Sequence, residues 1–361
     1  MLSWAVWTAV RHPAHRCPLV FGLGWWLGVA VVMAVPLPTF YVATSARLHY
    51  FGGAGLAIGL LWLLESVWGT AAWRKVAWTA VLLAILLPSG WFVRQMLDLY
   101  GRASTPFAQV GQFAAEWPAE DGVVLVNWPQ WLALPRNVFP VGADFAPVLG
   151  DHILPQGIVE GNLGRDRAPT TIVVEPSLLS ETTYPYAIYE LLAAPLISPT
   201  LASTQHVLLT RYGVDGPTAV HTGWLDYAPQ NAPPPLAVFG PLELLSAELV
   251  GCETAVPTTR LVWRPVGELP ATLSLFVQVL GADGTLIGQA DGPPLGLPPT
   301  RYHLTPALQL HDQREIPVAA EGTAVQLLVG AYDYTTGERF AAVDGTGAPL
   351  ADYAWRVECG E

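Results

Sequence analysis

"TTRLVWRPVGELPATLSLFVQVLGADGTLIGQAD", residues 258–291, sets the character of the second half of the chain. Three short apolar runs in it are separated by Gly, Pro and Asp, which are the residues that tight turns prefer. The apolar residues at alternate positions from Leu273 to Val279 would share one face of a strand, because side chains in a strand alternate between its two faces. The stretch therefore predicts short strands joined by turns, each with one buried face.

Similar runs continue to the end of the chain, and they extend this prediction. They are "AVQLLVGAYD", "ERFAAV" and "DYAWRVE", with turn signals "DYTTG" and "DGTG" between them. Several short strands with regular turns are typical of a sandwich of two sheets. We therefore expect an antiparallel β-sandwich over 237–361. The preceding "APQNAPPPL" indicates a linker, because clustered prolines cannot continue a strand or a helix.

The region from 104 to 230 has a different pattern. Phe107, Val110 and Trp117 in "STPFAQVGQFAAEWP" fall on one face of a helix. β-branched runs follow at "GVVLVNWP", "TTIVVEP" and "QHVLLTRY", and "YAIYELLAA" between the last two predicts a helix. Strands that alternate with helices are typical of an α/β layer, so we expect a small α/β domain here.

The first hundred residues predict membrane helices. The stretches 17–46, 48–64 and 76–93 contain no Asp, Glu, Lys or Arg, and only 13% of the whole chain is charged. About 20 apolar residues are enough to cross the hydrocarbon core of a bilayer. We expect a membrane region over 1–103 with three transmembrane helices near 17–36, 51–70 and 76–95. Three buried core helices would be the alternative. The fold class is thus a multi-domain membrane protein with an α/β domain and a sandwich.

The charges predict an orientation. Arg11 and Arg16 precede the first span, and Arg74 and Lys75 join the second and third, so the positive-inside rule places the N-terminus in the cytoplasm. Everything after about residue 103 would then be extracytoplasmic. That part has ten basic and 27 acidic residues, a net charge of −17, against seven basic and two acidic residues before it. Such an acidic surface excludes nucleic acid as a partner and indicates no attraction to anionic head groups.

The chain's start also carries an expectation. "MLSWAVWTAV" has no basic segment typical of a signal peptide and is too short to span a bilayer. It is typical of the last turns of a helix, so we expect the chain to be the carboxyl-terminal part of a longer membrane protein. A short interfacial helix at a true start is the alternative.

A family resemblance rests on the sandwich residues. "VWRPVGELPATLSLFVQVLGADGTLIGQADGPPLGLPPT" and "VGAYDYTTGERFAAVD" resemble the domain that ends many bacterial membrane glycosyltransferases of the GT-C type. Those enzymes include protein mannosyltransferases and the aminoarabinose transferase of lipid A, and they use a polyprenyl-phosphate sugar. "ARLHYFGGAGLAIGLL" is similar to their late "RYLY…P…G" segment, although this chain has "RLHY". The resemblance covers the sandwich well and the membrane part loosely.

The resemblance implies a donor site in the loop before the second span. Arg47 would bind the donor phosphate through its planar guanidinium, and His49 and Tyr50 would add hydrogen bonds or shape the sugar pocket. Membrane lipid and a polyprenyl-phosphate sugar are therefore the expected partners, with no cofactor. The alternative is that Arg47 only reaches to the interface and that Tyr50 belongs to an aromatic belt.

The family's catalytic carboxylate lies in a first outer loop that has no counterpart in this sequence. Glu65 and Asp98 are the only acidic residues up to Arg102, and neither belongs to an acidic motif. We therefore expect a chain that is inactive alone and that needs a catalytic amino-terminal half. Two alternatives stay open: a membrane-anchored protein that binds glycans or a partner without catalysis, and an accessory subunit of a separately encoded transferase.

Other candidate sites are weak, and we predict no metal site. Asp144, Asp151 and His152 share a loop segment, while His311 and Asp312 are adjacent and would face opposite sides of a strand. Turn capping explains Asp283, Gln289 and Asp291 better than sugar or calcium binding, and these three lie beside turns of the sandwich.

Cysteine positions predict a disulfide. Cys252 lies near the beginning of the sandwich and Cys359 at its end, whereas Cys17 would face the cytoplasm. The first and last strands of a sandwich are often neighbours, and an oxidising exterior would favour a bond between them. Two separate buried thiols are the alternative.

Overall fold

The fold is described by a computed structural model. It describes the residues in the following ranges: 13–34, 53, 55, 57–58, 72–135, 145–147, 159–160, 170–175, 178–179, 184–188, 197, 204–229, 233–318 and 325–359. The chain forms two compact units, one of residues 1–101 with 132–146 and the other of residues 102–131 with 147–361.

Two helices stand out in the described part of the chain, α2 (Pro13–Ala34) and α5 (Ala72–Glu116). Only α5 contains a stretch, Leu82–Glu116, that is long and apolar enough to cross a membrane, and the apolar segment Val20–Val29 in α2 is shorter. The prediction of three transmembrane helices is therefore wrong for the described residues. The expected span at 51–70 lies almost entirely outside them.

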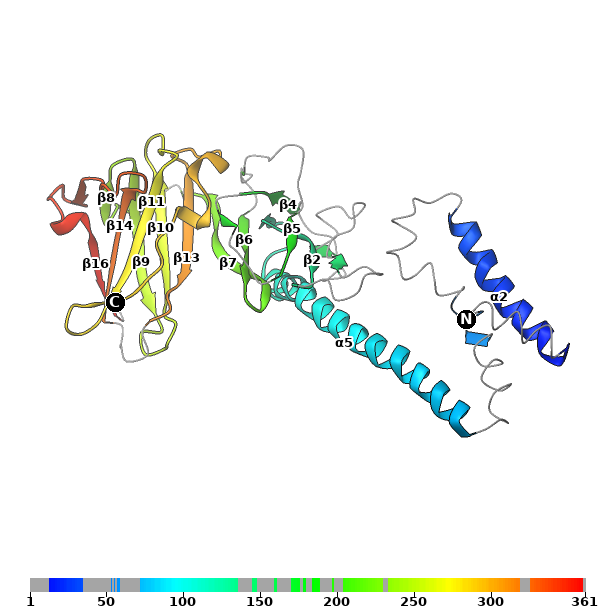
Figure 1. Cartoon of the computed structure of the whole chain (residues 1–361). Helices are drawn as coiled ribbons and strands as arrows, with labels where there is room; N and C mark the ends of the chain where they lie inside the picture. The colour runs from blue at the N-terminus through cyan, green and yellow to red at the C-terminus, as the bar shows by residue number, and fades with distance from the viewer. Residues whose placement is uncertain are drawn as a thin grey trace. The chain divides into compact units, whose positions relative to one another are not determined.

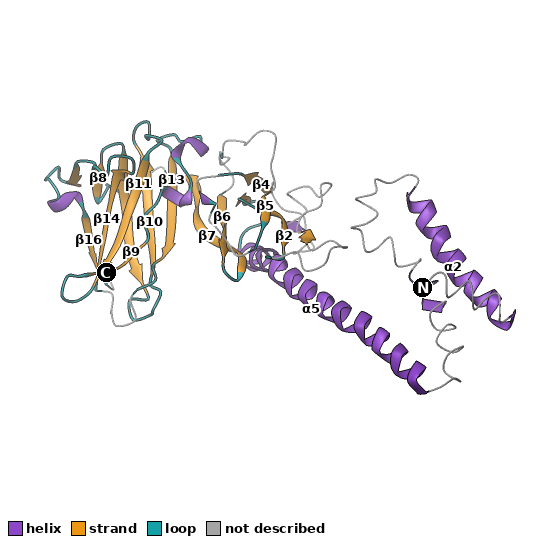
Figure 2. Cartoon of the chain, viewed as in Figure 1, coloured by secondary structure: helices purple, strands orange, loops and turns teal. Residues whose placement is uncertain are grey.

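The expected third span and the amphipathic helix after it are one continuous helix of 45 residues (Figures 1 and 2). The uncharged run ends at Arg94. A charged side chain indicates where the helix meets polar surroundings, but it does not indicate where the backbone hydrogen bonds of the helix end. Gly101 does not interrupt the helix, because a single interior glycine costs only about 1 kcal/mol relative to alanine.

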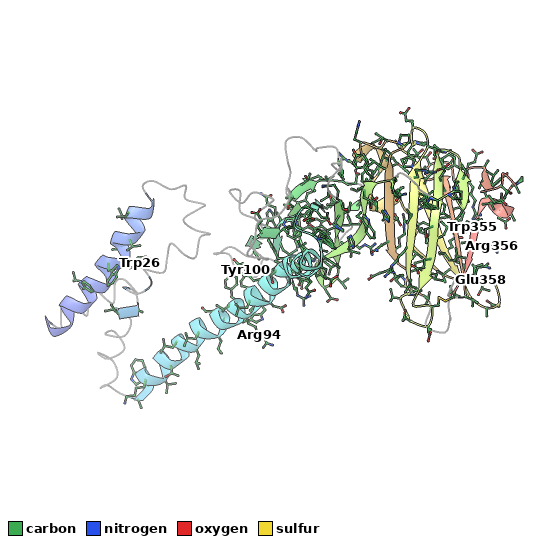
Figure 3. The ribbon with its side chains drawn as sticks, turned by 180° about the vertical axis from the view of Figure 1, so that it is seen from behind. Trp26, Arg94, Tyr100, Trp355, Arg356 and Glu358 are labelled. Carbon is green, nitrogen blue, oxygen red and sulfur yellow. A yellow bond between two sulfur atoms is a disulfide. The ribbon has the colours of Figure 1, made fainter. Side chains whose placement is uncertain are left out.

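The two halves of α5 have different surfaces. Many large apolar side chains of its first half are exposed, and Figure 3 shows Arg94 and Tyr100 projecting from the helix. The exposed apolar residues are Trp73, Val76, Leu83, Leu86, Leu87, Trp91, Val93, Leu97 and Tyr100. In the second half, Val110 and Ala114 are fully buried, and Phe107, Phe113 and Trp117 pack beside them. This confirms the amphipathic face expected from the sequence.

The second unit is built around a large mixed sheet. Its nine strands are, in spatial order, β15 (Ala342–Asp344), β8 (Ala237–Phe239), β9 (Leu242–Val250), β10 (Thr258–Pro265), β13 (Leu308–Glu315), β7 (Gly216–Tyr227), β6 (Gln205–Gly213), β1 (Gly122–Val126) and β4 (Thr170–Val173).

Two smaller sheets accompany it. The four-stranded sheet has the order β12 (Leu286–Gln289), β11 (Leu273–Leu280), β14 (Gln326–Asp333) and β16 (Trp355–Glu358). The three-stranded sheet has the order β3 (Phe145–Pro147), β2 (Pro129–Ala133) and β5 (Tyr186–Ile188). Short 3₁₀ helices lie in the connections: η3 (Pro294–Gly296), η4 (Pro299–Arg301) and η5 (Ala351–Tyr353).

One end of the large sheet is parallel and is covered by α5. β1 pairs in parallel with both β4 and β6. A core forms between these strands and α5, and it contains Val110 and Ala114 of the helix together with Leu125, Ile172 and Leu208 of the strands. All five residues of β1 are buried, as expected for a parallel strand that is covered on both faces.

The other end of the large sheet is antiparallel and packs against the four-stranded sheet. The inward face of β11, from Leu273 to Val279, has no exposed surface at its alternate positions, which confirms the expected strand face. Trp263 and Phe239 are buried in the same core, with ring centroids 5.8 Å apart.

The expected division into a separate α/β domain and a separate sandwich is wrong. β7 pairs with β6 on one side and with β13 on the other, so a single sheet runs through both regions. The strand runs were found in the sequence because their pattern is local, but strand partners are set by contacts distant in sequence. Tyr186–Ile188, expected to begin a helix, is strand β5.

Candidate functional site

The residues named as a donor site, Arg47, His49 and Tyr50, lie outside the part of the chain that the structure describes. The same holds for four other residues singled out from the sequence: Glu65, Asp144, Asp151 and His152. Asp98 is exposed on α5.

The residues named beside turns in the sandwich have structural partners. Asp283 accepts hydrogen bonds from the backbone N–H and the hydroxyl of Thr285, at 3.0 and 2.7 Å, which is the turn capping expected of it. Asp291 accepts the backbone N–H of Val277 at 3.0 Å, and burial raises the pKa of this carboxyl group. Gln289 is exposed at the end of β12.

The structure joins Cys252 and Cys359 in a disulfide, with Cα atoms 6.4 Å apart. Cys252 follows β9 of the large sheet, and Cys359 follows β16 of the four-stranded sheet. The bond therefore ties the two layers of the sandwich together and closes a sequence separation of 107 residues.

His311 and Asp312 lie on opposite faces of β13 and have separate roles. Asp312 is almost completely buried, accepts the backbone N–H of Leu295 at 2.6 Å and pairs with Arg314. Arg314 also donates to the backbone oxygens of Ala290 and Pro293, at 2.6 and 2.9 Å. This buried ion pair holds the segment around η3 against the sheet, which is a structural task.

A row of aromatic and imidazole rings crosses the other face of the large sheet. We call it the ring row, and its members are Trp117, His206, His221, Trp224 and His311. Trp117 follows α5, and the other four come from β6, β7 and β13. His206 and His311 are both register partners of Trp224, so three neighbouring strands place these rings side by side.

A β-bulge brings His221 into the row. The register of β6 and β7 shifts between Val207 and Leu208, so that Gly223 faces Val207 and His221 faces Leu208. In a regular strand, residues three positions apart point to opposite faces, but the extra residue puts His221 and Trp224 on the same face. Their ring centroids are 6.1 Å apart and nearly parallel.

Only glycine fits at position 223. Its φ of +132° is unfavourable for residues with a side chain, and an added Cβ would lie 1.8 Å from the carbonyl oxygen of His311. The preceding Thr222 points the other way and donates its hydroxyl hydrogen to the carbonyl of Leu295 at 2.8 Å. The bulge is therefore fixed by the close approach of β13 at Gly223 and by the hydrogen bond from Thr222 to the η3 segment.

A chain of hydrogen bonds runs through the ring row. Asp121 Oδ2 lies 3.2 Å from His206 Nε2, and His206 Nδ1 lies 3.3 Å from His221 Nε2. The other carboxylate oxygen of Asp121 accepts the backbone N–H of Thr204 at 3.2 Å. Asp121 and His206 are each only 7% exposed, so this charge-bearing chain is largely withdrawn from water.

The environment of His221 favours its neutral form. Burial lowers the pKa of His221 from 6.5 to about 4, with a further contribution from the neighbouring His206, while the backbone of Gly223 acts in the opposite direction. His206 stacks on Trp117, with centroids 3.8 Å apart and ring planes 2° from parallel. The ring centroid of Phe113 lies 5.8 Å from that of His221.

The far end of the row is more exposed and has its own carboxylate. His311 Nε2 lies 3.1 Å from Asp226 Oδ1, and the His311 ring stacks on Trp224 at 4.6 Å. The side chains of His311 and Asp226 are 19% and 32% exposed.

The arrangement can bind protons and can join α5 to the sheet. His206 uses both ring nitrogens within this hydrogen-bonded series. Among the described residues, no group of three His, Cys, Asp or Glu side chains is arranged to hold a metal ion. Sequence reasoning missed this cluster, because the imidazoles come together only through strand pairing. The one local signal was "HTGW" (221–224), since a glycine inside a strand often marks a bulge.

Comparison with known proteins found no match to this chain. No protein-family model, no curated protein and no solved structure matches the chain.

Proposed function

We propose that the chain is a membrane-anchored, extracytoplasmic domain that serves as the non-catalytic carboxyl-terminal part of a glycosyltransferase using a polyprenyl-phosphate sugar. The observation that carries the proposal is the change of surface along α5, from exposed apolar residues in its first half to residues buried under the sheet in its second half.

Such a helix suits a membrane anchor that continues into a folded domain. By length and composition, Leu82–Glu116 could cross a bilayer. Trp91 and Tyr100, 49% and 44% exposed, are of the type that gathers at membrane interfaces, and Arg94 between them could extend its charge to the head groups. The anchor would then end near the point where packing against the sheet begins.

The disulfide supports the extracytoplasmic side. Disulfides persist in oxidising compartments and are rare in the cytosol, where thiols are kept reduced. The bond between Cys252 and Cys359 ties the two layers of the sandwich. The basic residues near the amino terminus and at the start of α5 agree with a cytoplasmic location for those segments.

The glycosyltransferase part of the proposal comes from the resemblance of the segments 262–300 and 329–344 to the terminal domain of GT-C enzymes. These segments form most of the four-stranded sheet and the connections beside it. The donor would be held by Arg47, with His49 and Tyr50 beside it. The chain itself would supply anchoring and donor contact, and the catalytic carboxylate would come from another part of the enzyme.

Topology can be tested with protease on intact spheroplasts that express the chain. We expect cleavage after about residue 103, because the sheet domain would be accessible from outside. Inverted vesicles serve as the control and should protect the same region. Complete protection in spheroplasts with cleavage in inverted vesicles would contradict the proposed orientation.

Donor binding can be tested with a photoactivatable polyprenyl-phosphate sugar and the full-length chain in detergent. Arg47→Ala should weaken labelling about tenfold, the loss expected for one charged hydrogen-bonded contact. Arg47→Lys should also weaken it, because lysine keeps the charge but not the planar fork. Lys75→Ala, at the start of α5, is the matched control and should label normally.

Equal labelling of the wild type and Arg47→Ala would contradict the donor site. If the wild type itself shows no saturable labelling, a membrane-anchored protein that binds glycans or a partner becomes the better explanation. The anchoring part of the proposal is tested separately by the protease experiment.

A further inference from the structure

We propose that the hydrogen-bonded series Asp121–His206–His221 is an acid-sensitive latch. It fastens the end of α5 to the sheet while the two imidazoles share at most one excess proton, and it lets the helix end detach when both imidazoles become charged. The inference stands on the geometry of the ring row and does not depend on the proposed function.

Counting hydrogens shows why one excess proton is accommodated. The carboxylate of Asp121 can only accept, so His206 Nε2 carries a hydrogen toward it. The contact between His206 Nδ1 and His221 Nε2, 3.3 Å long, needs one hydrogen and one lone pair. With no excess proton, His221 Nε2 supplies that hydrogen, because neutral His206 carries its single ring hydrogen on Nε2. With one excess proton either ring can supply it, and the carboxylate of Asp121 balances the charge.

A second excess proton removes the contact. Both imidazoles would then carry N–H groups on the facing nitrogens, and two cations would lie 3.3 Å apart with no acceptor between them. The bonded arrangement therefore excludes the doubly charged state. Charging His221 requires that the two rings separate.

Among the residues that the structure describes, the groups in ring contact with His221 add no negative charge beyond Asp121. His206 on β6 lies on one side with Asp121 behind it, while Trp224 on β7 lies on the other side. Phe113 and Trp117 cover it from α5 and its end, and they are uncharged. Beyond Trp224, the carboxylate of Asp226 is already in hydrogen-bond contact with His311.

The latch holds a defined part of the molecule. His206 stacks against Trp117, directly after the last residue of α5, and His221 contacts Phe113 in the last turn. One turn earlier along the helix, Gln109 accepts the backbone N–H of Ala219 at 2.7 Å, which attaches α5 to β7 independently of the histidines. Opening of the latch would therefore free the helix end and the Trp117–Asp121 segment first.

The pH window follows from the sign of the shift. The pKa of His221 is lowered from 6.5 to about 4 in the closed state, so the open state binds more protons between these values. The latch is fully closed above about pH 6.5 and weakens as the pH falls toward 4. Between pH 7 and pH 5 the population of the open state should rise about twentyfold.

Hydrogen exchange on the full-length chain in detergent micelles tests the latch. The exchange rates are first corrected for the intrinsic effect of pH. The opening equilibrium constant of amides in 107–121 and 204–229 should then be about twentyfold larger at pH 5 than at pH 7. Amides of β11 and β14 in the sandwich should change little. A wild-type chain whose latch region and sandwich respond alike would overturn the proposal without any variant.

His221→Gln provides the sharper comparison. Glutamine can donate its amide N–H to His206 Nδ1, or accept from it, but cannot be charged, so the pH response of 107–121 should disappear while protection at pH 7 remains. His303→Gln, at an exposed histidine outside the ring row, should behave as the wild type. Circular dichroism checks that both variants are folded. A pH response that persists in His221→Gln contradicts the latch.

Discussion

The two ends of the nine-stranded sheet belong to one set of paired strands but are buried in different ways. At the parallel end, β1 lies between β4 and β6 and is buried at all five positions. At the antiparallel end, most positions of β10 alternate between buried and more exposed residues. A strand that is covered on two faces loses the period of two that a strand covered on one face retains.

The covering elements also differ. α5 covers the parallel end, and that contact is reinforced by the hydrogen bond from Ala219 N–H to Gln109 and by the ring contacts of Phe113 and Trp117 with the ring row. The antiparallel end is covered by a second sheet, a larger apolar core and a disulfide. The comparison teaches that one sheet can combine a polar, proton-dependent attachment at one end with a covalent, apolar one at the other.

Loss of the disulfide should have the largest effect on this comparison. Cys252→Ala combined with Cys359→Ala should lower the free energy of unfolding by up to about 4.7 kcal/mol, the chain-entropy value for a loop of about 100 residues. Denaturant unfolding measures the loss, and hydrogen exchange should localise it to the antiparallel end. Cys17→Ala is the control and should leave stability unchanged. A loss below about 1 kcal/mol would show that the apolar core alone secures this end.

A matched pair of core substitutions should separate the two ends. Leu125→Ala and Leu275→Ala each remove a leucine with no exposed surface, and each should cost about 2–5 kcal/mol. Leu125→Ala should raise exchange mainly in β1, β4 and the end of α5, because its core is the one beneath the helix. Leu275→Ala should raise it mainly in β11 and β14. Identical exchange patterns in the two variants would show that the sheet unfolds as a single cooperative body.

The smallest expected effect concerns two ion pairs between β9 and β10 at the antiparallel end. Arg264 bonds to Glu243 at 2.7 Å with both side chains mostly buried, 22% and 16% exposed. Arg260 lies 3.6 Å from Glu248 with both largely exposed, at 58% and 48%. Arg264→Ala should cost about 1–2 kcal/mol and Arg260→Ala less than about 1 kcal/mol, measured by thermal unfolding. Equal losses would mean that burial of the pair contributes little here.

Most strands and one helix face could be predicted from the sequence. The alternating apolar positions of β11, the β-branched run of β1 and the helical spacing of Val110 and Trp117 are local patterns, and each is found in the structure. The pairing of Cys252 with Cys359 followed from their places at the two ends of the sandwich sequence. Besides β5, six strands were not predicted: β2, β3, β7, β8, β9 and β13. Four of them, β7, β8, β9 and β13, lie beside predicted strands in the large sheet.

The number of membrane helices and the domain division were predicted wrongly for identifiable reasons. Uncharged runs indicate which segments can lie in an apolar environment, but they do not indicate where one helix ends and another begins. The sequence analysis therefore predicted two helices where the structure has the single helix α5. The proline-rich stretch before residue 237 suggested a domain boundary. The sheet crosses that boundary because β13, about 70 residues further on, pairs with β7.

By itself the sequence determined the elements whose signal lies within a few neighbouring residues: the strand faces, the turns, the amphipathic end of α5 and the acidic character of the region after it. Only the tertiary structure decided that His206, His221 and Asp121 form one hydrogen-bonded chain. These residues lie on separate elements, and a one-residue bulge at Gly223 turns His221 to the shared face. Strand pairing and side-chain direction at a bulge depend on partners far away in the chain, which no local pattern encodes.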